Sequence, residues 1–173
     1  MLSLPRAELS YHLRMSTPED VREQILGALG GRAAYPEAAS ALEGVPESAR
    51  GKRVPGIAHT LWQLLEHLRL AQWDILEYGR TPDHESPEFP VGYWPTSDSP
   101  PSDAAWNESL LGFFSDLDAL RKIAADRKLD LTAPIPHLDG VTWLRELMLV
   151  VSHNAYHIGQ FVQLRRALGC WNG

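Results

Sequence analysis

The sequence predicts an all-α protein, a four-helix bundle with a long overhead crossover between its second and third helices. Four segments place apolar residues at the three- and four-residue spacing of a buried helix face, and none sustains the alternation of a half-buried strand. A further segment, residues 80–102, contains six prolines, so it cannot be helical for long and is a poor central strand.

The first helix is expected from Thr17 to Leu29. Thr17 offers an N-cap, and Pro18 suits the first helical position because its missing N–H would have no partner there. The connection that follows carries a weak helical signal only at residues 37–42. We expect the rest of it, including the polar stretch 47–53, to be irregular.

The second helix is expected over residues 57–78, where apolar positions form one stripe bounded by Pro55-Gly56 and Gly79. A helix of about 22 residues is roughly 33 Å long, and an extended chain covers about 3.3 Å per residue. The proline-rich segment can therefore run the length of the bundle. This length allows the second and third helices to be parallel, as in bundles with one overhead connection.

The third helix is expected over residues 103–127, and the fourth over residues 142–169 with Thr142 as its N-cap. The fourth segment is apolar around most of its circumference, which is typical of a central helix. Its two histidines, His153 and His157, are therefore expected in or near the bundle interior.

Size and charge limit the class of protein. The chain has 173 residues, and we expect an N-terminal extension at residues 1–15 followed by one domain over residues 16–173. The formal net charge of −6 provides no basic footprint for nucleic acid. No segment reaches about 18 uninterrupted apolar residues, so no membrane association is expected. The single cysteine, Cys170, cannot form an internal disulfide, which fits a reducing, cytoplasmic setting.

The spacing of His153 and His157 indicates a metal site. Residues four apart in a helix lie one turn apart on the same face, close enough to bind one ion. Neutral imidazole suits zinc, nickel, iron and copper, and catalytic zinc sites typically use three protein ligands. His67, on the flank of the apolar stripe of the second helix, is the best third ligand. The alternative is a buried histidine bonded to a backbone carbonyl.

Other chemistries fit less well. Asn154 stands where a zincin metalloprotease carries its general-base glutamate, which disfavours that route of peptide hydrolysis. No histidine follows a glutamate by three residues, as di-iron bundles require, and no glycine-rich phosphate loop is present. His59 lies about two turns before His67 and can flank a site entrance, although a capping or surface role is expected for it. His84 and His137 fall in predicted loops.

Three further residues are candidates for acid/base chemistry or for orienting the ligands. Glu146 and Gln160 lie two turns before and one turn after the histidine pair, and Asp74 lies two turns after His67. Each can instead be structural: Glu146 can pair near Arg145, Asp74 can be a solvated acid, and Gln160 can brace the backbone.

Three motifs together resemble those of the DinB/YfiT-like superfamily of small bacterial metal-binding bundles. They are Trp62-Gln63-Leu64-Leu65-Glu66-His67, His153-Asn154-Ala155-Tyr156-His157-Ile158-Gly159-Gln160 and Leu164-Arg165. The resemblance spans residues 17–171, and it implies a divalent metal, Zn²⁺ or Ni²⁺, held by His67, His153 and His157.

The resemblance also implies frequent homodimerisation and, in some relatives, thiol transfer with bacillithiol or mycothiol-dependent isomerisation. We therefore expect a metal-dependent thiol transferase or hydrolase that acts on a small molecule, with a low-molecular-weight thiol as a candidate cosubstrate. The alternative is a non-catalytic bundle in which the metal is structural and the protein is a binding module. The aromatic crossover residues 89–94 are expected to pin the loop to the bundle, or else to cover a pocket mouth or a dimer contact.

Overall fold

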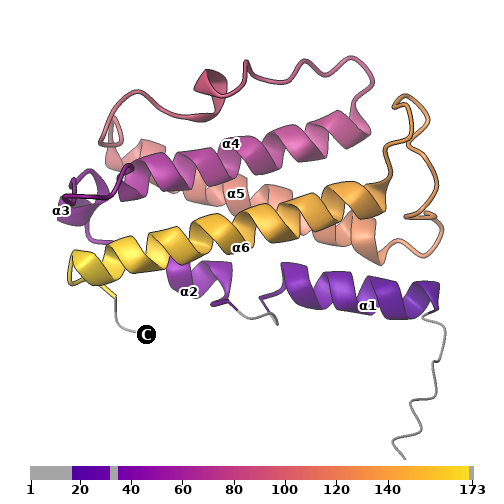
Figure 1. Cartoon of the computed structure of the whole chain (residues 1–173), viewed down its shortest axis with the longest axis horizontal. Helices are drawn as coiled ribbons and strands as arrows, with labels where there is room; N and C mark the ends of the chain where they lie inside the picture. The colour runs from indigo at the N-terminus through magenta and orange to yellow at the C-terminus, as the bar shows by residue number, and fades with distance from the viewer. Residues whose placement is uncertain (1–16, 32–34, 172–173) are drawn as a thin grey trace, which may run out of the picture.

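The computed structural model describes residues 17–31 and 35–171, and these residues form six α-helices, one 3₁₀-helix and no strand (Figure 1). The elements in order are α1 (Pro18–Leu29), α2 (Ala38–Leu42), α3 (Glu47–Arg50), α4 (Leu61–Arg80), η1 (Val91–Tyr93), α5 (Asp103–Ala125) and α6 (Trp143–Ala167). The predicted extension at residues 1–15 lies outside the described residues. No helix within the described ranges is long and apolar enough to cross a membrane.

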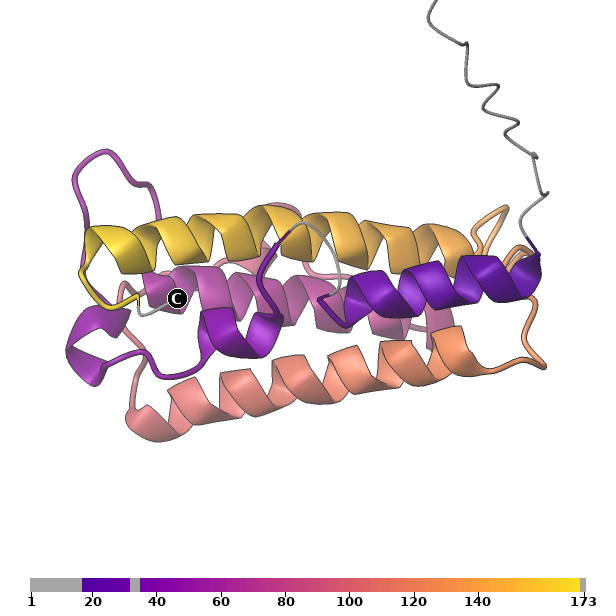
Figure 2. The same cartoon turned by 90° about the horizontal axis from the view of Figure 1, so that it is seen from below.

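The four long helices α1, α4, α5 and α6 form a bundle (Figures 1 and 2). The chain direction in Figure 1 shows that α4 and α5 run the same way and that α1 and α6 run the opposite way. Helix α4 contacts both α5 and α6, and α1 packs on α5 and α6. Between α4 and α5 the chain returns along α4, with η1 in contact with that helix. The prediction of an all-helical bundle is confirmed.

Side-chain caps decide where the long helices begin. Thr17, Ser102 and Thr142 each accept a hydrogen bond from a backbone N–H of the first turn, as the sequence predicts for Thr17 and Thr142. Helix α4 begins at Leu61 rather than at residue 57, because Thr60 and Gln63 form a reciprocal capping box that stops the helix from extending further back.

Two local predictions of secondary structure were wrong. The late start of α4 leaves His59 in the preceding loop and not on the helix. The stretch 47–53, predicted to be irregular, contains the one-turn helix α3. Its N-cap, Pro46, makes no side-chain capping bond, so the cap that marks the longer helices is missing there.

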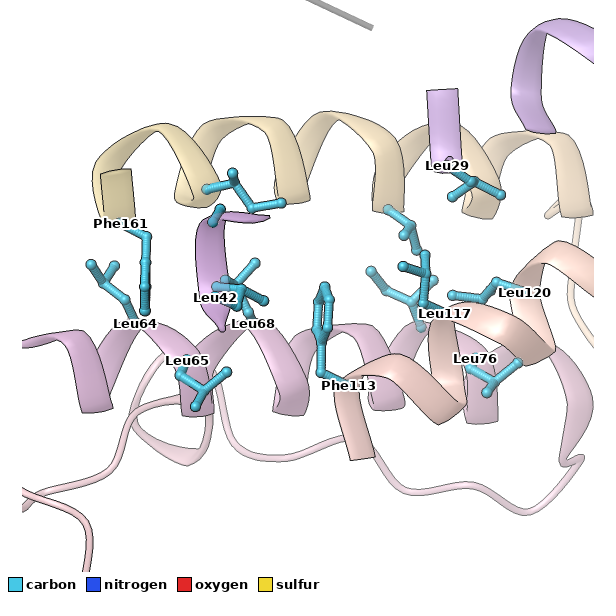
Figure 3. Close-up of a cluster of buried hydrophobic side chains, with 14 of the residues drawn as sticks. Leu29, Leu42, Leu64, Leu65, Leu68, Leu76, Phe113, Leu117, Leu120 and Phe161 are labelled. Carbon is cyan, nitrogen blue, oxygen red and sulfur yellow. The ribbon is translucent and has the colours of Figure 1, made fainter. Parts of the chain in front are cut away.

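The core lies between the long helices and under α2 (Figure 3). Its largest fully buried side chains come from α2, α4, α5 and α6, and they include Leu42, Leu64, Leu68, Phe113, Leu120 and Phe161. Each such side chain stabilises the fold by about 1.5–3 kcal/mol when it is fully buried. The packing holds α4 and α6 side by side, which is the arrangement the candidate site requires.

A buried amide pair aligns the three central helices. Asn154 of α6 donates from Nδ2 to Gln72 Oε1 of α4 at 2.9 Å, and Gln72 donates from Nε2 to the Phe113 carbonyl of α5 at 2.6 Å. Buried amides are costly unless they are hydrogen-bonded, so these two hydrogen bonds favour one relative placement of the three helices. Because Asn154 lies between the two histidines of α6 in the sequence, the hydrogen bonds that align the helices are next to these histidines.

Candidate metal centre

Three histidines from two helices meet between α4 and α6. The Nε2 atom of His67 lies 3.1 Å from the Nε2 atoms of both His153 and His157, and one nitrogen from each ring lies within 4.8 Å of the others. His67 and His157 are each 8% exposed, and His153 is half-buried. The structure therefore brings together the three residues that the sequence singles out as ligands.

The hydrogen bonds of two remote ring nitrogens assign the tautomers. Nδ1 of His67 lies 3.0 Å from the carbonyl oxygen of Tyr93, and Nδ1 of His157 lies 2.8 Å from Oε1 of Gln160. Both oxygens can only accept, so both Nδ1 atoms carry the proton in the neutral rings. The lone pairs of His67 and His157 are therefore on Nε2 and point to a common centre.

Burial favours the neutral form of all three rings. It lowers the pKa of His67 to about 4 and that of His153 to about 4, and the neighbouring histidines add to both shifts. Burial also lowers the pKa of His157. Neutral imidazole is the form that binds a metal, so these rings are ready ligands near neutral pH.

The separation of the nitrogens fits one shared ion. Two nitrogens bound at about 2.0–2.1 Å to one ion lie about 2.8–3.4 Å apart for bond angles between a right angle and a tetrahedral one. The two separations from Nε2 of His67, 3.1 Å each, lie in that range. Without a cation, the Nε2 lone pairs of His67 and His157 would face each other unshielded. Nδ1 of His153 is buried and has no hydrogen-bond partner in the part of the chain that the structure describes.

Aromatic residues of the crossover cover one side of the cluster. The Trp94 ring stacks on His67, with ring centroids 3.8 Å apart and an interplanar angle of 4°. His59, from the loop before α4, also stacks on Trp94 at 3.9 Å. Tyr93 and Trp94 thus fasten the crossover to the bundle, as expected. One of the residues that they contact is the candidate ligand His67.

A comparison with protein families agrees with this geometry. A family model described as the DinB superfamily matches residues 32–161, which include all three histidines. The chain belongs to the DinB superfamily. Comparisons with curated proteins and with solved structures gave no match.

Two of the three predicted accessory residues are connected to the histidines of this DinB-superfamily protein. Gln160 contacts His157 directly through its side-chain oxygen. Asp74 does not touch a histidine of the cluster; it accepts hydrogen bonds from the Tyr93 hydroxyl and from Nε2 of His84, each at 2.7 Å. Asp74 is therefore connected to His67 through Tyr93.

Glu146 lies apart from the cluster. It is 1% exposed and pairs with the side chain of Arg145. Seven residues separate it from His153, which corresponds to about 10 Å along the helix axis. The remaining predicted loop histidine, His137, contacts the Tyr78 carbonyl through Nε2 at 3.2 Å.

The sequence does not indicate the contacts of several groups around the three histidines. The carbonyl of Tyr93 is a backbone group, which every residue has, so the sequence cannot single it out. The aromatic pair Tyr93-Trp94 in a proline-rich segment is a signal, but it does not indicate which helix receives it. Asn154 was noticed only as the residue that stands in place of a catalytic glutamate, whereas it bonds to Gln72.

Proposed function

We propose that this DinB-superfamily protein binds a divalent metal ion through His67, His153 and His157 and acts on a small molecule as a metal-dependent thiol transferase or hydrolase. The observation that carries the metal proposal is the convergence of the three Nε2 atoms, at 3.1 Å from His67 to each of the others. The remote nitrogens of two rings are already bound to acceptor oxygens, which leaves the converging nitrogens free to bind an ion.

The nature of the donors supports Zn²⁺ or Ni²⁺. Imidazole nitrogens suit both ions, and the cluster contains no carboxylate or thiolate that would favour calcium, magnesium or an iron–sulfur cluster. A divalent ion bound by three histidines supplies Lewis acidity and lowers the pKa of a water or thiol at an open position. This chemistry is the basis for proposing thiol transfer or hydrolysis.

The residues around the ligands have separate tasks in this proposal. The Tyr93 carbonyl and the Gln160 amide hold two rings in the ligating tautomer. The Trp94 ring lies against His67 and excludes water from that side. Access for a substrate is therefore proposed from the side that the crossover leaves free.

Elemental analysis of the purified protein tests the metal site. The wild type is expected to contain close to one equivalent of zinc or nickel, and His153→Ala and His157→Ala are expected to lose it. His137→Ala is the matched control, because this histidine lies outside the cluster and its Nε2 contacts the Tyr78 carbonyl. A metal-free wild type, or unchanged occupancy in the two cluster variants, would contradict the proposal.

Catalysis needs its own measurement. The metal-loaded protein would be assayed with electrophilic acceptors and low-molecular-weight thiols, and separately with ester and amide substrates. Turnover that disappears on chelation and returns with added metal supports an enzyme. No turnover by a fully loaded protein across both sets counts against this reading.

A structural role for the metal is the second candidate. The ligands come from both α4 and α6, so a bound ion would also fasten two central helices. Structural zinc sites usually have four protein ligands, whereas three histidines with an exchangeable position favour catalysis. X-ray absorption spectroscopy of the metal-loaded protein distinguishes the two roles. Three nitrogen ligands plus an exchangeable oxygen ligand support a catalytic metal, and four protein ligands support a structural metal.

We also propose that the protein forms a homodimer. Helix α6 carries exposed apolar side chains, with Met148 at 51% and Tyr156 at 65% exposure, which supports a protein contact on its outer face. Light scattering on a size-exclusion column is expected to give twice the chain mass of 19.3 kDa. A monomer at micromolar concentration would contradict the dimer.

A further inference from the structure

Asp74 has two hydrogen-bond donors, and both come from the crossover. The carboxylate receives one bond from the Tyr93 hydroxyl and one from His84, each at 2.7 Å. The group is largely shielded from water, since the side chains of His84 and Asp74 are 8% and 12% exposed. In such surroundings each of these charge-assisted bonds is stronger than it would be at an open surface.

The same tyrosine reaches the candidate ligand by a different group. Its hydroxyl binds Asp74, and its carbonyl oxygen lies 3.0 Å from Nδ1 of His67. Both Asp74 and His67 belong to α4, seven residues apart, which is about 10 Å along the helix. Tyr93 therefore spans two turns of one helix and is fixed at both ends.

Other anchors hold a different part of the crossover. Thr60 donates to the carbonyl of Asp98, and Arg53 pairs with the carboxylate of that residue. Both contacts lie near the start of α4, and the crossover residue that makes them, Asp98, follows Trp94 in the chain. The part of the crossover that precedes Trp94 is fastened to α4 by the hydrogen bonds to Asp74 and by the edge-on contact of the His84 ring with Trp73.

We propose that Asp74 is a positioning residue for the metal ligand His67. By binding the Tyr93 hydroxyl and the His84 ring, it holds the Tyr93 carbonyl against Nδ1 of His67 and so keeps Nε2 of that ring aimed at the centre of the cluster. The inference rests on the proposed metal function, and it adds a remote carboxylate that determines the orientation of one ligand.

Four variants test the connection. Tyr93→Phe removes only the hydroxyl and keeps the ring and the carbonyl, whereas Asp74→Ala removes both acceptor oxygens. Asp74→Asn is the conservative variant, because its amide can still accept from Tyr93 and can donate to the other tautomer of His84. Asp98→Ala is the matched control, since it removes a crossover carboxylate that does not contact Tyr93.

Binding of Co²⁺ provides a spectroscopic readout of the ligand field. Tyr93→Phe and Asp74→Ala are expected to bind Co²⁺ about tenfold more weakly and to shift its visible absorption bands, as expected when a partner that orients a metal-binding histidine is lost. Asp74→Asn and Asp98→Ala are expected to keep the wild-type bands and affinity. The double variant Tyr93→Phe/Asp74→Ala is expected to be no weaker than Asp74→Ala, because the two changes break the same connection.

The metal-free protein provides a second readout. Long-range ¹H–¹⁵N spectra are expected to show His67 protonated at Nδ1 in the wild type and in Asp98→Ala, and as a mixture of tautomers in Tyr93→Phe and Asp74→Ala. A wild-type protein that binds no Co²⁺ would overturn the metal site, and the tautomer of His67 would then decide the positioning role by itself. Wild-type bands, affinity and tautomer in both variants would overturn the role of Asp74, whatever happens to their melting temperatures.

Discussion

Replacing Gln160 tests whether the direct partner of His157 contributes to metal affinity. Its Oε1 lies 2.8 Å from Nδ1 of His157, so Gln160→Met removes the acceptor and keeps a side chain of similar length. Loss of such a partner costs about 10–100-fold in metal affinity, or about 1.4–2.7 kcal/mol. Gln160 also lines a cavity of about 450 Å³, from which water can replace the lost acceptor. The expected loss is therefore about tenfold, the lower end of the range.

Gln160→Glu is expected to strengthen the same hydrogen bond to His157. A carboxylate is a stronger acceptor than an amide and raises the basicity of the ligand, so affinity is expected to equal or exceed that of the wild type. Zinc titration against a chromophoric chelator near neutral pH measures all variants. Gln163→Met is the control, because Gln163 lines the same cavity and is exposed on α6. Equal affinity of Gln160→Met, Gln160→Glu and the wild type would refute the reasoning.

Three further predictions concern stability. Because the pKa values of His67 and His153 are lowered from 6.5 to about 4, the unfolded chain binds more protons than the folded one between these values. The melting temperature of the metal-free protein should therefore fall as the pH drops from 6.5 towards 4, and a flat profile would count against neutral buried rings. Arg165 is 5% exposed and donates to carbonyls of the α2 segment and to that of Cys170. Arg165→Ala should lower the free energy of unfolding by about 2–4 kcal/mol in a urea titration, because bonds from a charged donor to buried carbonyls are lost, and a loss below about 1 kcal/mol would show that water replaces them. A Cβ at Gly79 would lie 2.4 Å from the Trp143 ring, so Gly79→Ala should cost about 1–3 kcal/mol; a thermal melt unchanged from the wild type would contradict this close contact.

The burial of Arg165 shows how tertiary structure changes the meaning of a residue. From the sequence, an arginine in the last turn of the fourth helix is a favourable charge at the negative end of the helix dipole. In the fold its guanidinium is enclosed and binds the carbonyls of Ala41 and Glu43, more than 120 residues earlier in the chain. This side chain thus fastens α2 to α6.

Some site residues could likewise be predicted from local spacing, whereas others depend on tertiary packing. The pair His153 and His157 could be predicted because residues four apart meet on one helix face, and Gln160 was identified for the same local reason. Its third member, His67, was a candidate on position alone until packing placed it 3.1 Å from a histidine 90 residues away. Asp74 was a candidate accessory residue from its position alone, and its connection to His67 passes through a tyrosine of the crossover.

The sequence by itself determined the helical class, the starts of the two long helices capped by Thr17 and Thr142, and which three histidines are candidate ligands. Each of these properties depends on residues a few positions apart, whose geometry in a helix is known in advance. The tertiary structure alone decided the tautomers of His67 and His157, the cover of Trp94 and the connection from Asp74. Apart from the short contact between Gln160 and His157, these features depend on a backbone carbonyl and on side chains brought together from distant segments, and only the packing of α4, α6 and the crossover brings them into contact.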